Sequence, residues 1–379
     1  MAEPFKLLIN AETVRHASAH LRRQWRGFDT RRFETTLLDG LDALEFKARA
    51  MRWADALQAT MPADFDRACG LIEQALAPPL SVDEAGEPIG LQGGLHPDGI
   101  AGWALWGTGE WVTRSGQHAP LRALQCLHAI TQRFTAEFAI RPFIAQHPEA
   151  VWPVLRQWVH DDSAHVRRLV SEGSRPRLPW GLRLQALVKN PAPTLPLLLA
   201  LQDDPSAYVR RSVANHLNDI AKDHPALVAQ WVGQHRPGAS PAREALLRHA
   251  SRGLIKAGHA PTLAAWGLTQ GFDGSATLRL SARSVRVGER IDLLGELKAT
   301  SAQHLVVDYA VHHVKANGGT APKVFKGWKL SMAAGETRSL QKSHSLREVT
   351  TRRLYPGRHR IELLVNGVAV ADAAFELKP

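Results

Sequence analysis

The sequence predicts a multidomain protein, α then β: a HEAT-like α-solenoid followed by an immunoglobulin-like β-sandwich. Three observations predict this fold class. Apolar residues recur at helical spacing over roughly the first 270 residues, a pattern of 43 residues repeats within that part, and apolar and polar residues alternate from residue 275 onward. We therefore expect a helical domain at residues 1–272 and a sandwich at residues 275–379.

The helical part begins with three expected helices. Apolar or aromatic residues at helical spacing predict them at Ala11–Trp25, Phe33–Leu57 and Asp64–Ala77. The stretch Pro78–Gly116 is rich in Gly and Pro, which interrupts the pattern. Because this stretch also holds three tryptophans, we expect a packed connector there rather than a flexible linker.

A helix pair repeats beyond that connector, and each copy has a Pro that opens a first helix, an Asp pair, and a Val-Arg-Arg triplet in a second helix. These are Pro148, Asp161-Asp162 and Val166-Arg167-Arg168 in one copy, and Pro191, Asp203-Asp204 and Val209-Arg210-Arg211 in the next. The Pro and Val offsets are both 43 residues, and a further unit begins at Pro225. Such a period is typical of HEAT or armadillo units, whose second helices line a concave face. The Asp pairs are expected to cap the second helices.

Period-two alternation predicts the strands of the C-terminal part. The runs are Thr277–Ser284, Ile291–Lys298, Leu305–Val314, Lys323–Leu330, His359–Val365 and Val368–Leu377. Between the last two runs, Asn366-Gly367 predicts a hairpin, because both central positions of a type I′ turn need a positive φ. Six or seven strands in about 105 residues indicate an immunoglobulin-like sandwich.

Composition limits the class of protein. The hydrophobic fraction of 44% excludes a disordered chain, and two cysteines are too few for a disulfide framework. No apolar run approaches the length of a membrane span, and the N-terminus lacks the pattern of a secretory signal. We expect a cytoplasmic protein that does not associate with a membrane.

The net charge of +11 is unevenly distributed. Residues 275–379 contain 17 Lys and Arg against 9 Asp and Glu, a net of +8, whereas residues 1–274 contain 30 against 27, a net of +3. Excess positive charge favours a polyanionic partner such as nucleic acid. Most of that excess lies in the predicted sandwich.

Aligned repeats bring acidic and polar residues to one level of the solenoid. Glu137 falls opposite Glu172, which in turn falls opposite Asn215. Asp219 lies one helical turn beyond Asn215, on the same face. Six arginines surround them: Arg141, Arg168, Arg175, Arg177, Arg210 and Arg211. Because carboxylates oppose the binding of a polyanion, their presence suggests a site that binds phosphates at its edge and holds negative charge beside a cationic centre.

The segment Ser174–Trp180 between two of these helices is stiff and basic. Pro176 and Pro179 restrict its backbone, so it can hold the aromatic face of Trp180 at the mouth of the groove. Two plainer interpretations stay open: the arginines form ordinary salt bridges to neighbouring repeats, and Trp180 only packs. Histidines flank Asp161-Asp162 but have no counterpart in the next repeat, so no metal site is expected.

Three long strings occur in order in the helical part: Thr135–Phe143, Ser171–Trp180 and Tyr208–Ile220. Together they resemble the AlkC branch of the bacterial HEAT-like-repeat DNA alkylation-repair glycosylases, and the resemblance covers essentially the whole helical part. The sandwich is similar to the immunoglobulin-like domain of one subgroup of that family.

The resemblance implies a monofunctional DNA glycosylase that removes cationic alkylated bases, chiefly 3-methyladenine and also 3-methylcytosine, without full base flipping. Carried onto this sequence, it implies Glu137 and Asp219 as catalytic carboxylates. Glu172 would be a further acidic member of the site, and Trp180 the aromatic one. We expect a monomer that acts on double-stranded DNA and needs no cofactor.

The implied chemistry agrees with these residue types. A cationic alkylated base is a good leaving group, so cleavage needs no general acid and develops positive charge on the deoxyribose. A carboxylate stabilises that charge and can orient a water, and a Trp face adds cation–π attraction.

Two loops of the sandwich are candidate DNA contacts, one with Lys315 and Lys323 and one with Arg352 and Arg353. Together with the net charge of +8, they favour a clamp in the minor groove. The alternative is a sandwich that only docks on the solenoid. For the whole chain, the alternative to an enzyme is a non-catalytic HEAT-repeat scaffold that binds DNA or a protein partner.

Overall fold

The structure is a computed structural model that describes residues 5–90, 95–349 and 353–379. The chain divides into two compact units, residues 1–223 and residues 224–379. Unit 1 is helical. Its helices are η1 (Phe5–Leu8), α1 (Ala11–Gln24), α2 (Thr30–Leu38), η2 (Leu41–Ala43), α3 (Phe46–Thr60), α4 (Phe65–Ala75), α5 (Ala104–Ser115), α6 (Pro120–Thr131), α7 (Glu137–Gln146), α8 (Pro148–Trp158), α9 (Ala164–Gly173), α10 (Gln185–Lys189), η3 (Ala192–Thr194), α11 (Leu195–Leu201) and α12 (Ala207–Ile220). Within the described ranges, every helix is too short or too polar to cross a membrane.

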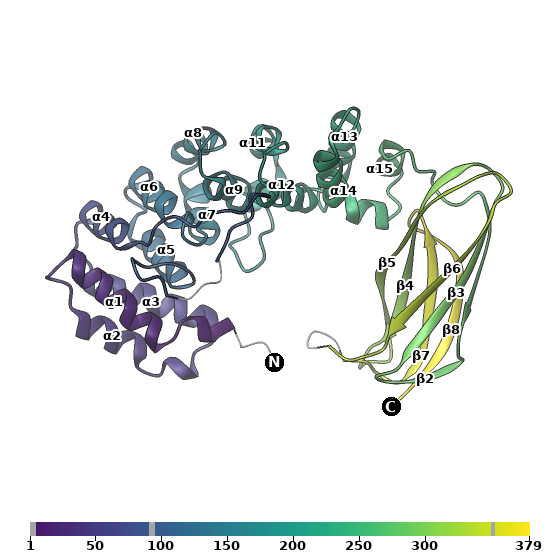
Figure 1. Ribbon diagram of the computed structural model, residues 1–379, viewed down its shortest axis with the longest axis horizontal. Helices are drawn as coiled ribbons and strands as arrows, with labels where there is room; N and C mark the ends of the chain where they lie inside the picture. Colours follow the sequence, from purple (N-terminus) through teal and green to yellow (C-terminus); the bar gives the residue numbers. More distant parts are fainter. Residues whose placement is uncertain (1–4, 91–94, 350–352) are drawn as a thin grey trace. The chain divides into compact units, whose positions relative to one another are not determined.

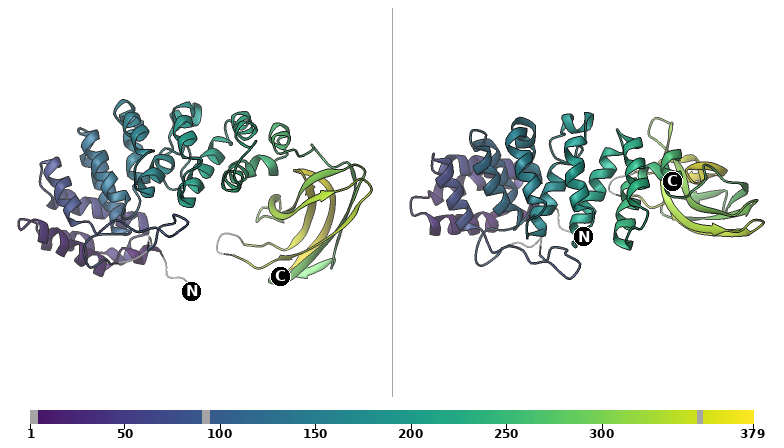
Figure 2. Two further views of the ribbon diagram at one scale, coloured as in Figure 1. Left: turned by 45° about the horizontal axis from the view of Figure 1, so that its top comes forward. Right: turned by 90° about the horizontal axis from the view of Figure 1, so that it is seen from above.

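The helices of unit 1 stack as successive pairs (Figure 1, Figure 2). In Figure 1, α6, α8 and α11 lie on the outer side of the stack and α5, α7, α9 and α12 on the inner side. Helix α9 packs against both α7 and α12. Its buried residues Val166, Leu169 and Val170 recur at helical spacing, as do Val209 and Val213 on α12. The inner helices therefore place the three candidate carboxylates on neighbouring elements.

The second helices begin at serine N-caps rather than at the predicted aspartates. Ser163 precedes α9 and Ser206 precedes α12, where the Ser206 hydroxyl accepts from the amide of Val209 at 3.4 Å. Asp161 and Asp204 lie two residues earlier, and each accepts from the serine N–H at 2.8 Å. The Asp pairs thus shape the turn before each helix, and the prediction that they cap it was wrong.

Two predictions about the N-terminal helices were also wrong, both because of glycine. The helix expected over Phe33–Leu57 is two helices, α2 and α3, separated at Gly40, whose φ of 63° suits a helix end. Part of the expected connector Pro78–Gly116 is the helix α5. There Gly107 approaches α3 so closely that a Cβ would lie 2.4 Å from Cβ of Trp53. This glycine permits close helix packing rather than a loop.

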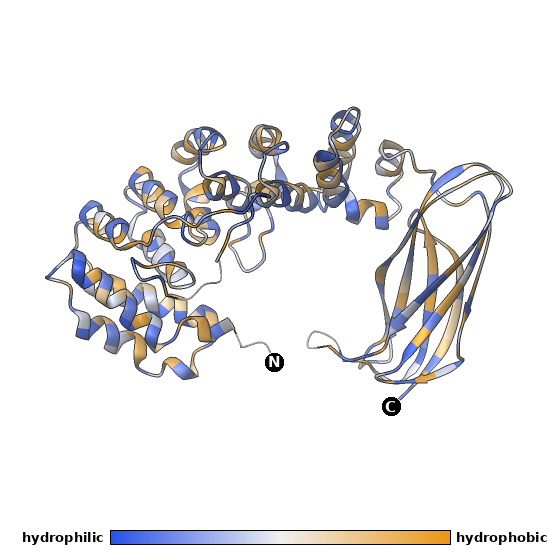
Figure 3. Cartoon of the chain, viewed as in Figure 1, coloured by the Kyte–Doolittle hydropathy of each residue, from blue (hydrophilic) through white to orange (hydrophobic). Residues whose placement is uncertain are grey.

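Unit 2 begins with α13 (Pro225–His235), α14 (Pro241–Lys256) and α15 (Ala260–Ala265) and continues as a β-sandwich. The strands are β1 (Gly274–Leu280), β2 (Ser284–Arg286), β3 (Arg290–Ala299), β4 (Gln303–Val314), β5 (Thr320–Met332), β6 (Thr337–Ser345), β7 (Gly357–Val365) and β8 (Val368–Lys378). One sheet has the order β1-β3-β6 and the other β2-β8-β7-β4-β5, and β2 runs parallel to β8. Figure 3 shows hydrophobic and hydrophilic residues interleaved along the strands, and a shared core includes Ile291, Val307, Ile361 and Phe375. The predicted order, helices followed by a sandwich, is confirmed.

The sandwich confirms one turn prediction and adds two strands to the six predicted runs, the short β2 and β6. Asn366 and Gly367 have φ values of 49° and 82°, as the predicted hairpin between β7 and β8 requires. Strand β6 was not predicted from the sequence, because most of its residues are polar. Only Leu340 and His344 in it are buried, so the alternation of apolar residues that marks a strand is absent.

Candidate active site

Three inner helices of unit 1 bring Glu137, Glu172 and Asp219 into one network of charged side chains. Glu137 is the first residue of α7, Glu172 lies near the end of α9, and Asp219 lies near the end of α12. All three are buried, with exposed fractions of 8%, 6% and 1%. Two arginines join them.

Arg168 of α9 joins Glu137 to Glu172. Its Nη1 donates to Oε2 of Glu137 and, at 2.8 Å, to Oγ1 of Thr135. Its Nη2 lies 3.5 Å from Oε1 of Glu172. The guanidinium also lies over the ring of Tyr208 from α12, 5.0 Å from the centroid. Arg168 thus contacts groups from three successive parts of the stack.

Arg175 joins Glu172 to Asp219. Its Nη1 donates to Oε1 of Glu172 at 2.7 Å, and its Nε donates to Oδ2 of Asp219 at 2.8 Å. The second oxygen of Glu172 accepts from Ser212 at 2.6 Å, and the second oxygen of Asp219 accepts from Lys222 at 2.9 Å. Both oxygens of each carboxylate therefore have a donor, which compensates their burial.

Burial and the neighbouring arginines shift the pKa values of Glu137 and Glu172 in opposite directions. Burial raises the pKa of Glu137; Arg168 offsets this only in part, and the charge of Glu172 reinforces it. Burial acts the same way on Glu172, but Arg168 and Arg175 outweigh it and hold the pKa of Glu172 below its ordinary value. Of these two groups, Glu137 is therefore the one that acidification neutralises first.

Arg141 does not lie at the edge of this network. It is completely buried on α7, where Nη1 donates to the carbonyl of Gly173 at 2.9 Å and Nε to that of Leu182 at 2.5 Å. Burial lowers the pKa of Arg141 to about 10, so it stays charged at neutral pH. Because its guanidinium bonds the backbone inside the protein, the predicted DNA contact of Arg141 was wrong. It fixes the connector that follows α9.

That connector presents Trp180 to solvent. The side chain is 67% exposed, and its φ of 64° lies in the left-handed region, which costs a non-glycine residue roughly 1–2 kcal/mol. The next residue is Gly181, where a Cβ would lie 3.2 Å from Nε of Arg141. Leu182 is also exposed. Strain and exposure at a large aromatic residue indicate a functional position, and the role of Trp180 stays a prediction.

Replacing Arg141 by methionine should loosen the connector. Its two charge-assisted bonds are each worth about 1.5–3 kcal/mol, so amide hydrogen exchange at Gly181 and Leu184 should accelerate by at least about tenfold. The amides bond the carbonyls of Leu178 and Pro176 within the connector. The control is Arg183→Met, at an exposed position of the same segment. Equal exchange in both variants would remove Arg141 from this role.

Two predicted DNA-binding arginines form ion pairs within unit 1. Arg177 makes two bonds to Asp223, at 2.7 and 2.6 Å. Arg211 makes two bonds to Glu87, at 2.5 and 2.7 Å, although half of its side chain is exposed. These pairs match the plainer interpretation of the arginines. Phosphate contact by Arg177 and Arg211 stays a prediction.

Arg210 makes the same backbone contacts as Arg167, its equivalent in the preceding repeat. Its Nη1 donates to the carbonyls of Asp204 and Pro205, as Arg167 does to the equivalent turn 43 residues earlier. Arg167 in addition bonds the carboxylate of Asp204 at 2.6 and 3.0 Å and so joins the two repeats. Asn215 is half-buried on the same helix as Arg210. DNA contact by Arg210 and Asn215 stays a prediction.

The basic loops of the sandwich lie at one end of the five-stranded sheet. Lys315 and Lys323, in and beside the β4–β5 turn, are exposed, and so is Arg353. A Cβ on Gly357, at the start of β7, would lie 3.5 Å from Val314, which places the start of β7 beside the end of β4. Arg352 lies outside the described residues. Their contact with DNA stays a prediction.

The structure adds residues that the sequence reasoning missed. Lys222, Ser212, Thr135 and Tyr208 complete the network around the carboxylates. Lys222 follows Asp219 by three residues, a helical spacing that brings side chains together and could have identified it. Thr135, just before α7, and Ser212 and Tyr208, both on α12, contact residues of α9, so only the tertiary structure reveals them.

Comparisons with known proteins give this arrangement a family. A model of the C-terminal immunoglobulin-like domain of the uncharacterised protein YhaZ matches residues 274–379. The uncharacterized protein YhaZ of Bacillus subtilis (strain 168) is 33% identical over 382 residues, 98% of this chain and 99% of its own. Alkylpurine DNA glycosylase AlkC of Pseudomonas fluorescens, solved bound to DNA containing an abasic site analogue, is 33% identical, with a TM-score of 0.86 and coverage of 100% of both chains. This chain belongs to the AlkC family.

Membership of the AlkC family confirms the resemblance that the three sequence strings indicated. The similarity extends over both units, so it includes the helical stack of unit 1 and the sandwich of unit 2. The match at residues 274–379 likewise confirms the immunoglobulin-like class of the sandwich.

Proposed function

We propose that this AlkC-family protein is a DNA glycosylase in base excision repair. Its substrates are cationic alkylated bases, chiefly 3-methyladenine and also 3-methylcytosine, which it excises without full base flipping. Full-length similarity to a DNA-bound alkylpurine DNA glycosylase supports DNA as the partner. The observation that carries the catalytic part is the buried network of Glu137, Glu172 and Asp219.

The reaction breaks the bond between C1′ of the deoxyribose and the base. The bonding electrons neutralise the cationic base, and positive charge develops on the sugar as it approaches an oxocarbenium ion. Preorganised carboxylates stabilise that charge more strongly than water does, because they do not reorient during the reaction. Water then adds to C1′, a carboxylate accepts its proton, and an abasic site remains.

Trp180 supplies the aromatic group of the proposed site. Its connector is bound to the network through Arg175, which contacts both Glu172 and Asp219. An exposed indole face on this connector can lie against the cationic sugar or base from outside the protein, and cation–π attraction is worth about 0.5–2 kcal/mol. A base that stays in the duplex needs such an exposed partner rather than a deep pocket.

The enzyme is proposed to be monofunctional. Lys222 is the lysine in direct contact with the network, and its ammonium donates to Asp219. This nitrogen is already engaged by the carboxylate, whereas a Schiff-base nucleophile must attack the sugar as an uncharged amine. Borohydride should therefore trap no covalent complex with DNA.

The decisive experiment is base release from methylated duplex DNA by the purified protein. Free 3-methyladenine and 3-methylcytosine are quantified against an enzyme-free control. Release of either base above the control supports the glycosylase. Tight DNA binding without any release would instead favour the non-catalytic scaffold.

On acidification, the rate of excision should begin to fall at a higher pH than the titration of an ordinary glutamate would give. The raised pKa of Glu137 means that its neutral form appears at a higher pH, and the neutral form cannot stabilise a cationic sugar. Below that pKa the single-turnover rate should fall about tenfold for each pH unit. The lowered pKa of Glu172 keeps that group charged throughout. Residual activity of Glu137→Gln should lack this acid limb; an identical limb in the variant would assign it to another group.

We also propose that the two basic loops of the sandwich hold DNA. Charge reversal of Lys315 and Lys323 should weaken binding to an undamaged duplex and flatten its salt dependence, by about one unit of slope for each lost phosphate contact. The single-turnover excision rate at saturating enzyme should stay unchanged. Unaltered binding would favour a sandwich without a role in DNA contact.

A further inference from the structure

Helix α14 carries a row of cations along one face. Arg248, Arg252 and Lys256 follow one another at intervals of four residues, so their side chains lie on the same side. Like charges at this spacing repel one another. Arg248 lies 3.6 Å from Glu244, and Arg252 donates to the carbonyl of His249 at 3.3 Å. The row therefore keeps a positive excess.

A β-bulge in β5 adds two more cations opposite this row. Lys326 and Lys329 are three residues apart and would normally point to opposite faces of the sheet. The register shifts between Val307 and Asp308, and Gly327 is the extra residue, so Val306 pairs with Lys329 and Asp308 with Lys326. Both lysines consequently share the face of Val306 and Asp308.

Glycine is required at the bulge. A Cβ on Gly327 would lie 2.4 Å from the carbonyl oxygen of Val307. The amide of Gly327 donates to Oδ1 of Asp308 at 3.1 Å, so this carboxylate already serves the bulge. The sequence Lys326-Gly327-Trp328-Lys329 thus uses a local irregularity to direct two lysines to one side.

The cations of α14 and β5 line one cavity of about 380 Å³ within unit 2. Its lining contains five Lys and Arg side chains against one carboxylate, Asp308, and its floor includes Ala245, Ile255 and Val306. Burial, together with the nearby charges of Arg248 and Lys326, lowers the pKa of Lys329. A bound anion would relieve this repulsion.

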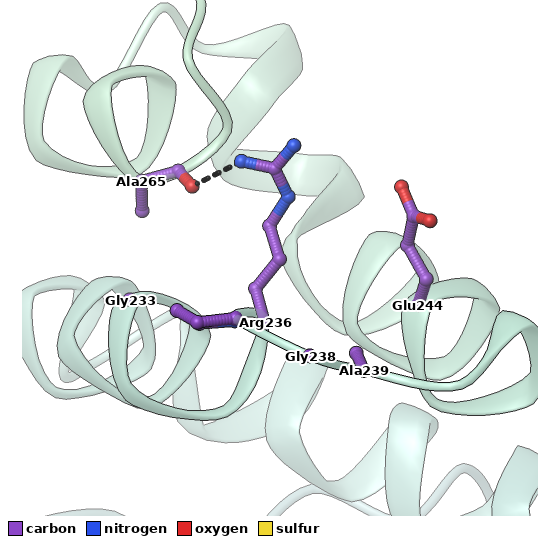
Figure 4. A pocket seen from close by; sticks show the side chains of 7 residues that line it. Gly233, Arg236, Gly238, Ala239, Glu244 and Ala265 are labelled. Atoms are coloured by element: carbon purple, nitrogen blue, oxygen red, sulfur yellow. Dashed lines mark hydrogen bonds between the residues drawn. The ribbon is translucent and has the colours of Figure 1, made fainter.

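A second cavity of about 300 Å³ shares Arg248, Val306 and Lys329 with the first and extends it to Arg236 and Trp266. The ring of Trp266 orients two guanidinium groups, that of Arg248 at 4.2 Å and that of Arg236 at 4.8 Å from its centroid. Arg236 also lines a third cavity, of about 310 Å³, where it donates to the carbonyl of Ala265 at 2.9 Å (Figure 4). Positive charge therefore continues along the junction of the C-terminal helices and the sheet.

We propose that the cavity between α14 and the β5 bulge is a phosphate-binding site. Planar guanidinium groups bond two phosphate oxygens at once, and lysines add mobile point charges, so the set suits phosphate better than carboxylate. Its source is the phosphodiester backbone of DNA or a free polyphosphate. The DNA source rests on the proposed function, whereas phosphate binding itself does not.

The test compares the double variant Lys326→Glu/Lys329→Glu with the wild-type chain. Binding of an undamaged 24-base-pair duplex is followed by fluorescence anisotropy over a range of salt concentrations, and binding of tripolyphosphate is followed by calorimetry. Loss of two phosphate contacts should weaken duplex binding roughly tenfold and reduce the slope of log K against log salt by about two. Because the duplex carries no lesion, the result does not depend on glycosylase activity.

The matched control is Arg279→Glu/Lys298→Glu, which makes the same change of charge at exposed positions of the other sheet. A larger loss of duplex binding in the cavity variant supports the site with DNA as its source. A loss for tripolyphosphate alone supports the site with a free polyphosphate as its source. Equal binding of both probes by the two variants would overturn the proposal. Circular dichroism verifies folding, and Lys326→Gln/Lys329→Gln, which removes the same two phosphate contacts, replaces a variant that does not fold.

Discussion

Replacing Asp219 by asparagine should lower the single-turnover rate of 3-methyladenine release by about 10²–10³-fold, the usual effect of removing one preorganised electrostatic group from a transition state. Asparagine keeps the shape of the side chain but removes the charge that opposes a cationic sugar. Affinity for undamaged DNA should stay equal or rise, because a negative group is lost. Rapid-quench measurement of base release at saturating enzyme gives the rate.

Asp223→Asn is the matched control for that experiment. Asp223 lies four residues after Asp219, in the turn that follows α12, and pairs with Arg177 nearer the surface. Its replacement removes the same charge four residues away but outside the network, so the excision rate should change little. Equal losses in both variants would indicate a general electrostatic effect and would contradict a specific role for Asp219.

The repeat spacing predicted the neighbourhood of the site but not its contacts. An offset of 43 residues aligned Glu172 with Asn215, whereas in the structure the long Arg175 side chain joins Glu172 to Asp219, one turn farther on. Periodicity fixes the face on which a residue lies. It does not fix how far a side chain reaches, and in this site two arginines determine which carboxylates meet.

Burial explains the errors about individual residues. Arg141 was predicted to contact DNA as one of the arginines around the carboxylates, yet it is completely buried and bonds two carbonyls. The stretch that contains Gly107 was predicted to be a connector, yet Gly107 lies in a helix and allows close packing of α5 on α3. Each error reflects a tertiary contact that overrides a local preference. The exposure of Trp180 was easier to foresee, since prolines at 176 and 179 restrict the connector.

Replacing Arg175 by alanine should be the most destabilising change in the network. Truncation leaves the buried carboxylates of Glu172 and Asp219 without the guanidinium between them, and uncompensated buried charges of this kind cost about 3–5 kcal/mol. The urea midpoint should fall by roughly 1 M or more. Arg175→Lys should recover part of the loss, because one ammonium cannot bond both carboxylates in the same way.

The pH dependence of that loss gives a second and independent test. Arg168 and Arg175 hold the pKa of Glu172 below its ordinary value despite burial, so their stabilisation is present above the unfolded pKa and disappears as the pH falls through the folded pKa. The difference in stability between Arg175→Ala and the wild-type chain should therefore shrink on acidification below about pH 4. Arg177→Ala removes an ion pair nearer the surface and should leave the urea midpoint almost unchanged. A pH-independent loss for Arg175→Ala would mean that packing, rather than its charge, accounts for the stabilisation.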